Sequence, residues 1–229
     1  SRGLGDVYKR QELVLLMAAL TKGGKTTIAM ALCNPKYRAK MASLSNCRTE
    51  VTVDWTYDTG ANDIALKEIL LNYQGVFGTD FKERISCEKF SEVLDSEEGK
   101  YLQDIFGLEK QENLSGSELE QYVLNAIMSY VNSCDEEGLA KLIKNRLSNR
   151  FLRRIKVVVP PVEEFAQFFD EKTVSLVLRD TRGLLDIDPE EATKVQSRTM
   201  QELGIDGIDA VLLLGTAAPF ADTIKWYKN

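Results

Sequence analysis

The spacing of apolar and polar residues divides the chain into strand-like ends and a helix-like middle. Residues 12–18 (ELVLLMA) form an almost continuous apolar run, which is typical of a buried strand in a parallel sheet. Residues 48–58 (RTEVTVDWTYD) alternate between apolar and polar, which predicts a strand with one buried face. Further apolar runs predict strands at 155–159 (IKVVV), 173–178 (TVSLVL) and 209–214 (DAVLLL).

The middle of the chain, from about residue 61 to 149, has helical periodicity instead. Its first apolar stripe consists of Leu66, Ile69, Leu70 and Tyr73. A longer stripe follows the capping-box pattern Ser117-x-x-Glu120, a common helix start. Shorter helices are expected directly after the first strand, in TTIAMALC, and from Pro189 to about Leu203. We therefore expect an α/β sheet that is interrupted once, by a mostly helical insertion over residues 59–149.

Composition and charge exclude several classes of function. The 229 residues are 44% hydrophobic and 28% charged, enough to bury a core. No apolar run approaches the roughly 18 residues that a membrane-spanning helix needs. The sequence contains no histidine, which excludes Ser-His-Asp and Cys-His catalysis and histidine metal sites. A net charge of −6 argues against general nucleic-acid binding.

The cysteines indicate a cellular compartment and not a metal site. Cys33, Cys47, Cys87 and Cys134 lie far apart and show no metal-site spacing. Such cysteines are typical of reduced thiols, so we expect a cytoplasmic protein.

The first residues have a separate origin. Residues 1–11 (SRGLGDVYKRQ) match a translated reading frame of an adaptor used to prepare sequencing libraries. We expect these residues to be a non-native scar, with the native N-terminus missing, and they are left out of the fold prediction.

A phosphate-binding loop is predicted between the first strand and the first helix. Gly24-Lys25-Thr26 matches the last three positions of the pattern G-x-x-x-x-G-K-[ST]. Glycine lets backbone N–H groups approach a phosphate, and the positive end of the following helix faces the anion. Lys25 is expected to reach the β- and γ-phosphates, while the Thr26 hydroxyl ligates Mg²⁺. Lys22, Gly23 and Thr27 complete the predicted loop.

A second motif follows the predicted strand at 173–178. Asp180 stands at the end of this strand, in the sequence Asp180-Thr181-Arg182-Gly183. If the strand is parallel to the first one, the Asp180 carboxylate can reach the same Mg²⁺, usually through water. The backbone N–H of Gly183 can then approach the γ-phosphate.

These motifs resemble those of a known family. The G-K-T-T loop, the D-T-R-G motif and the D-A-V-L-L-L strand are similar to the GTPase domain of P-loop GTPases, and most of all to the large, dynamin-like bacterial GTPases. The resemblance implies a P-loop NTPase sheet over residues 12–58 and 150–229, truncated at its C-terminus. It also implies binding of GTP with Mg²⁺, GTP hydrolysis, and switching or self-association as the usual output. Peripheral attachment to a membrane and the protein partner stay open.

The sequence departs from the family pattern at informative positions. Ala19 replaces the first glycine of the loop, and Arg182 replaces a proline. Leu184 stands where small GTPases have the glutamine that orients the attacking water, so the catalytic residue is unknown. The switch I threonine is either Thr49 or Thr52.

Two other functions stay open at this point. The base-specifying N/T-K-x-D motif does not occur between the last predicted strand and residue 229, so ATP is an alternative ligand. A P-loop ATPase is the first alternative, although Lys22 and Lys25 are three apart, whereas the two lysines of plasmid-partitioning ATPases are five apart. The second alternative is a nucleotide-binding scaffold or regulator that does not hydrolyse its ligand.

One charged segment has no role in the predicted site. Residues 141–156 hold seven basic side chains and no acid. An anionic membrane surface, a nucleic acid or a catalytic arginine could each use such a segment. We expect a solvated helix face that leads into an exposed strand.

Overall fold

The protein has an α/β fold built on one mixed, six-stranded sheet, which confirms the predicted class. The computed structural model describes residues 11–19, 24–45, 51–71, 86–170, 174–181 and 208–214. The strands are β1 (Gln11–Ala19), β2 (Val53–Tyr57), β3 (Ala65–Leu71), β4 (Leu152–Val159), β5 (Val174–Asp180) and β6 (Ala210–Leu214). They pair in the order β3-β4-β2-β5-β1-β6. The helices of the described residues are α1 (Lys25–Leu32), η1 (Pro35–Tyr37), α2 (Arg38–Ser45), α4 (Cys87–Asp95), α5 (Glu97–Phe106), α6 (Gly116–Ser133), α7 (Glu136–Lys144), α8 (Ser148–Phe151) and α9 (Glu163–Asp170).

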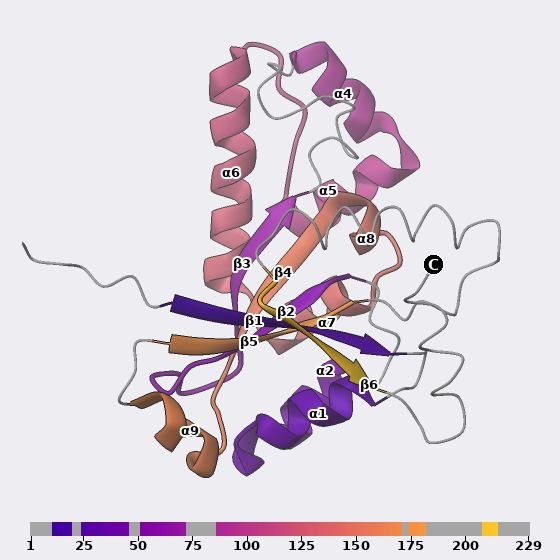
Figure 1. The fold of residues 1–229 in the computed structure, drawn as a ribbon. Coiled ribbons are helices and arrows are strands. Elements are labelled where there is room, and N and C mark those ends of the chain that lie inside the picture. Colours follow the sequence, from indigo (N-terminus) through magenta and orange to yellow (C-terminus); the bar gives the residue numbers. More distant parts are fainter. Residues whose placement is uncertain are drawn as a thin grey trace, which may run out of the picture. The chain divides into compact units, whose positions relative to one another are not determined.

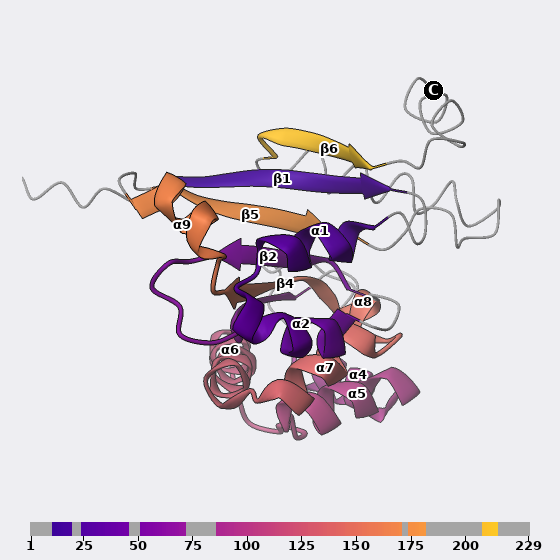
Figure 2. The same cartoon turned by 90° about the horizontal axis from the view of Figure 1, so that it is seen from below.

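The strand β1 is the centre of the parallel part of the sheet. It pairs in parallel with β5, where Met17 lies opposite Asp180, and in parallel with β6, where Leu15 lies opposite Ala210. Figure 2 shows β6, β1, β5 and β2 side by side, with the arrowhead of β2 pointing opposite to the other three. The carboxyl ends of β1 and β5 therefore meet at one edge of the sheet, as the two predicted motifs require.

One sequence prediction is wrong: the region 59–149 is not helical from its start, because residues 65–71 form β3 (Figure 1). Leu66 and Ile69 are buried three residues apart, which imitates a helical stripe. In a strand, residues three apart point to opposite faces, and α6 and α7 contact this strand. Backbone pairing with a neighbouring strand is a non-local interaction that overrides such a local pattern.

Other elements extend what the patterns predicted. The strand β4 begins at Leu152, and β5 ends on Asp180 itself. The helices α2 and α9 were not predicted. The helix expected from Pro189 to about Leu203 lies outside the described residues.

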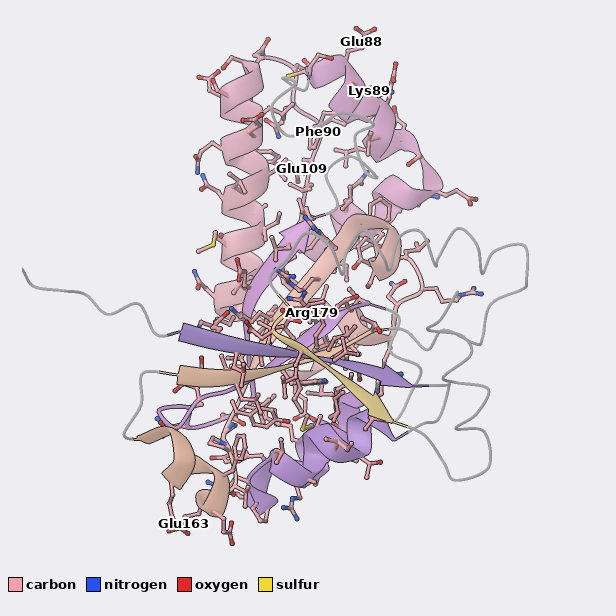
Figure 3. All side chains as sticks on the ribbon, in the orientation of Figure 1. Glu88, Lys89, Phe90, Glu109, Glu163 and Arg179 are labelled. Carbon is pink, nitrogen blue, oxygen red and sulfur yellow. The ribbon has the colours of Figure 1, made fainter. Side chains whose placement is uncertain are left out.

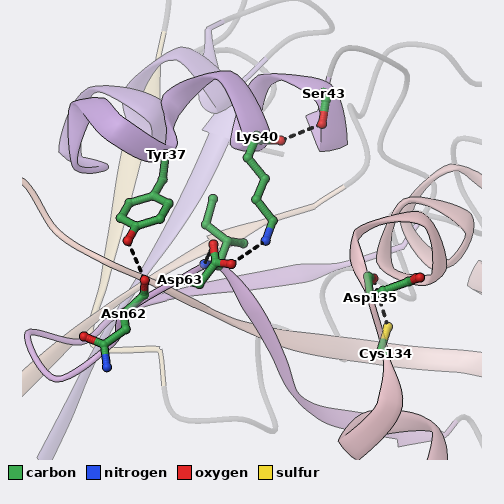
Figure 4. Close-up of polar contacts among 8 residues, drawn as sticks. Tyr37, Lys40, Ser43, Asn62, Asp63, Cys134 and Asp135 are labelled. Atoms are coloured by element: carbon green, nitrogen blue, oxygen red, sulfur yellow. Dashed lines mark hydrogen bonds and ion pairs between the residues drawn. The ribbon is translucent and has the colours of Figure 1, made fainter.

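Contacts divide the chain into two compact units. The first comprises residues 1–45, 54–64 and 158–229, and the second comprises residues 46–53 and 65–157. In the first unit, η1 and α2 both contact the turn that follows β2 (Figure 4). The Tyr37 hydroxyl donates to the carbonyl of Asn62, and Lys40 Nζ lies 2.9 Å from Asp63 Oδ2.

In the second unit, α4, α5, α6 and α7 each begin at a side-chain cap. Ser115 caps α6 through a full capping box with Glu118. This box lies two residues before the predicted one, Ser117 and Glu120. Phe90 of α4 points toward α6, where its ring meets that of Tyr122 edge to face, while Glu88 and Lys89 point away (Figure 3). These contacts give the second unit its own apolar core.

Candidate functional site

The N-terminus of α1 is the first part of the site. Its N-cap, Gly24, has a φ of 82°, a left-handed conformation that favours glycine over any residue with a Cβ. The first helical hydrogen bond runs from the N–H of Ile28 to the carbonyl of Gly24. The N–H groups of Lys25, Thr26 and Thr27 thus precede the helical ladder and carry the positive end of the helix dipole. This end of α1 can bind an anion.

Asp180 is the second part of the site. It is the last residue of β5, next to β1, and its side chain is 2% exposed. Lys25 Nζ lies 3.9 Å from Asp180 Oδ1, and the Lys25 side chain is 11% exposed. The structure therefore brings a lysine and a carboxylate that are far apart in the sequence into one buried ion pair.

The surroundings of Asp180 stabilise its negative charge only in part. Burial raises the pKa of its carboxyl to about 6, and the Lys25 charge, the Trp55 indole N–H and the Thr26 hydroxyl lower the pKa in part. Within the described residues, Asp180 Oδ1 has no hydrogen-bond partner. Buried polar atoms are nearly always hydrogen-bonded, so an unpartnered carboxylate oxygen is typical of a place where a ligand binds.

These groups fit a magnesium ion. Mg²⁺ prefers oxygen ligands and keeps several waters, so one carboxylate and one hydroxyl beside a phosphate are enough. Asp180 Oδ1 is such an unpartnered oxygen, and Thr26 supplies the hydroxyl. In the part of the chain that the structure describes, no cluster of three or more acidic or thiol side chains could hold a metal by itself. A metal here would need oxygens from the bound phosphates.

The opposite face of the same two strands holds a different pair. Arg179 Nε donates to Asp54 Oδ1 at 2.8 Å, and Arg179 Nη2 donates to Asp54 Oδ2 at 2.9 Å. Both side chains are almost fully buried, and Arg179 lies among the strands of the sheet (Figure 3). This bidentate pair links β2 to β5.

Sequence reasoning missed the partners on β2. Asp54 was assigned to the polar face of an alternating strand, but all five residues of β2 are buried. Trp55 falls on the apolar face of that alternating pattern, and it lies beside Asp180. An acid in one largely apolar strand and a base in another were the available signal for the Asp54–Arg179 pair.

The other residues predicted for the site lie outside this arrangement or outside the described residues. Thr27 is exposed on the first turn of α1. Thr52 directly precedes β2, and its carbonyl accepts from the N–H of Ile155. Of the residues named for the predicted site, six lie outside the described residues: Lys22, Gly23, Thr49, Arg182, Gly183 and Leu184.

Three features lie away from this site. Cys33, Cys87 and Cys134 are free thiols, and burial raises the pKa of Cys33 to about 11. In the basic segment, Lys141 pairs with Glu137 at 2.9 Å along α7. Among the helices that the structure describes, none has the length and apolarity to cross a membrane.

Comparison with known proteins does not identify a family for this chain. The sequence matches no model of a known protein family, and a search of curated proteins finds no match either.

Proposed function

We propose that this protein binds a nucleoside triphosphate, preferably GTP, together with Mg²⁺, and that it hydrolyses the nucleotide. The observation that carries the proposal is the buried Asp180 carboxylate with an unpartnered oxygen, 3.9 Å from Lys25 at the start of α1. Lysine, helix N-terminus and carboxylate are the groups that phosphates and their magnesium ion require.

Each group has a distinct role in the proposal. The N–H groups at the start of α1 and the Lys25 ammonium bind the phosphates. Thr26 and Asp180 hold the magnesium ion, which neutralises charge on the phosphates when it is bound. The position of Asp180 at the carboxyl end of β5, beside β1, supports these roles. The preference for GTP rests on the D-T-R-G motif.

Nucleotide binding is the direct test. Titration of the chain with a fluorescent GTP analogue, in Mg²⁺ and in EDTA, should show binding that is tighter in Mg²⁺. Lys25→Ala should weaken binding about 10- to 150-fold, because hydrogen bonds to charged groups contribute about 1.5–3 kcal/mol. Lys36→Ala is the matched control, since Lys36 is an exposed lysine of the same unit that lies over the Tyr37 ring. Wild-type affinity in Lys25→Ala would contradict the proposal.

Competition and turnover separate the remaining alternatives. Unlabelled GTP should displace the analogue at lower concentration than ATP, and the reverse order would favour a P-loop ATPase. Phosphate release under saturating GTP and Mg²⁺ then measures hydrolysis. Binding without release would favour a nucleotide-dependent regulator.

A further inference from the structure

The indole of Trp55 is a buried donor without a partner. Trp55 is fully buried in β2, and its Nε1 has no hydrogen-bond partner within the described residues. A buried tryptophan N–H usually finds an acceptor, because an unpaired donor costs about 1–3 kcal/mol. Trp55 Nε1 and Asp180 Oδ1 are thus two buried polar atoms without a hydrogen-bond partner among the described residues.

The two residues lie on the same face of the sheet. Successive residues of a strand point to opposite faces, so the Asp54–Arg179 pair on one face puts Trp55 and Asp180 on the other. The Tyr57 hydroxyl donates to the carbonyl of Ala29 in α1, which shows that this second face of β2 lies toward α1. Trp55 therefore shares its surroundings with Lys25 and Thr26.

The indole N–H lies near enough to the Asp180 carboxyl to affect its charge, although it does not complete a hydrogen bond to it. Together with Lys25 and Thr26, it lowers the pKa that burial raises. Lys25, Thr26 and Trp55 differ in the partner that each would have once a nucleotide is bound. Lys25 would turn to the phosphates and Thr26 to the metal, whereas the buried indole N–H is hydrogen-bonded to no other group among the described residues.

We infer that Trp55 is a positioning residue for Asp180: its indole N–H holds one carboxylate oxygen, so that the other faces the magnesium ion. A neutral donor suits this role, because it stabilises the carboxylate without competing with a cation for the site. The bidentate Asp54–Arg179 pair links β2 to β5, and a slip of β2 by one residue would turn Trp55 to the face opposite Asp180. This inference rests on the proposed function.

The spectroscopic test follows the indole itself. The chain has two tryptophans, and Trp226→Phe leaves Trp55 as the single ¹⁵N-indole signal. Addition of GTP with Mg²⁺ should move the indole proton downfield, as its hydrogen bond to the carboxylate forms. GTP in EDTA should move the signal less. An indole signal that Mg²⁺ leaves unchanged, in a chain shown to bind Mg²⁺-GTP, would overturn the inference.

A variant measures the same effect on affinity. In Trp55→Phe the tightening of GTP binding by Mg²⁺ should shrink about tenfold or more, as expected for loss of a hydrogen bond to a charged group. The affinity in EDTA should change little. Tyr57→Phe is the matched control, because it removes a hydroxyl from the same strand face and should keep the wild-type response to Mg²⁺.

The outcomes separate the two proposals. If the wild-type chain binds no nucleotide, the proposed function fails and this inference falls with it. If Trp55→Phe binds GTP with the wild-type response to Mg²⁺, only the inference is overturned. If Trp55→Phe does not fold, the indole signal of the Trp226→Phe chain decides.

Discussion

The two faces of the β2–β5 strand pair hold two buried carboxylates in contrasting environments. On one face, both oxygens of Asp54 accept from Arg179, at 2.8 and 2.9 Å. On the other, Asp180 Oδ1 has a lysine at 3.9 Å and no hydrogen-bond partner among the described residues. The side chains are 4% and 2% exposed, so burial does not distinguish them.

The contrast lies in how well each charge is matched. A bidentate arginine satisfies a carboxylate in geometry and in charge, which gives a structural link between strands. A carboxylate with an open oxygen is held at a cost to stability, and such groups are typical of functional sites. Adjacent residues of one strand, Arg179 and Asp180, thus differ in this respect: the charge of Arg179 is matched, and that of Asp180 is only partly matched.

The largest effect is expected from breaking the matched pair. Asp54→Ala leaves the Arg179 guanidinium buried without its main partner, and should lower the free energy of unfolding by about 3–5 kcal/mol. The midpoint of urea unfolding, followed by circular dichroism, measures this loss. The double variant Asp54→Leu/Arg179→Met should recover at least half of the loss, because well-packed apolar side chains often replace a buried ion pair without cost. A loss below about 1 kcal/mol, typical of surface pairs, would show that the pair is not buried as described.

An intermediate effect of opposite sign is expected from Asp180→Asn. The variant removes a poorly matched buried charge, and should raise the free energy of unfolding in EDTA at pH 7.5 by about 1–3 kcal/mol. The same variant should lose the tightening of GTP binding by Mg²⁺. A destabilised Asp180→Asn chain would mean that the carboxylate is as well matched as Asp54.

The pH dependence gives the control for this variant. Because the pKa of Asp180 is raised from 3.8 to about 6, the folded chain holds the proton more tightly than the unfolded chain. Ionisation of Asp180 therefore lowers stability as the pH rises from near 4 through about 6. The gain from Asp180→Asn should be absent near pH 4 and complete at pH 7.5. An equal gain at both values would show another origin.

The smallest effect is expected from Tyr57→Phe. Tyr57 lies on the face of Asp180, but its hydroxyl has a partner, the carbonyl of Ala29. Its removal should cost about 0.5–1.5 kcal/mol in urea unfolding, the ordinary value of a hydrogen bond. A neutral effect would show that the hydrogen bond of this hydroxyl to Ala29 makes no net contribution to stability.

Local patterns predicted the strands that lead into the site and failed at one element beyond it. The apolar runs at 12–18 and 173–178 correspond to β1 and β5, because a strand buried among others is apolar along its length. Residues 65–71 were assigned to a helix, because Leu66 and Ile69 are three apart, as on one face of a helix. In the structure these residues lie in the strand β3, which α6 and α7 contact. Pairing between distant strands decides such cases, and local spacing does not contain it.

The sequence by itself determined which groups carry the candidate chemistry. Glycine, lysine and threonine at 24–26 and an aspartate at a strand end are local features, and each can be found from its neighbours in the chain. Only the tertiary structure decided the surroundings of that aspartate. Arg179 and Asp54 are 125 residues apart, and Trp55 is as distant from Asp180. The alternation of a strand tells which residues share a face, but the order of strands in the sheet decides which side chains meet there.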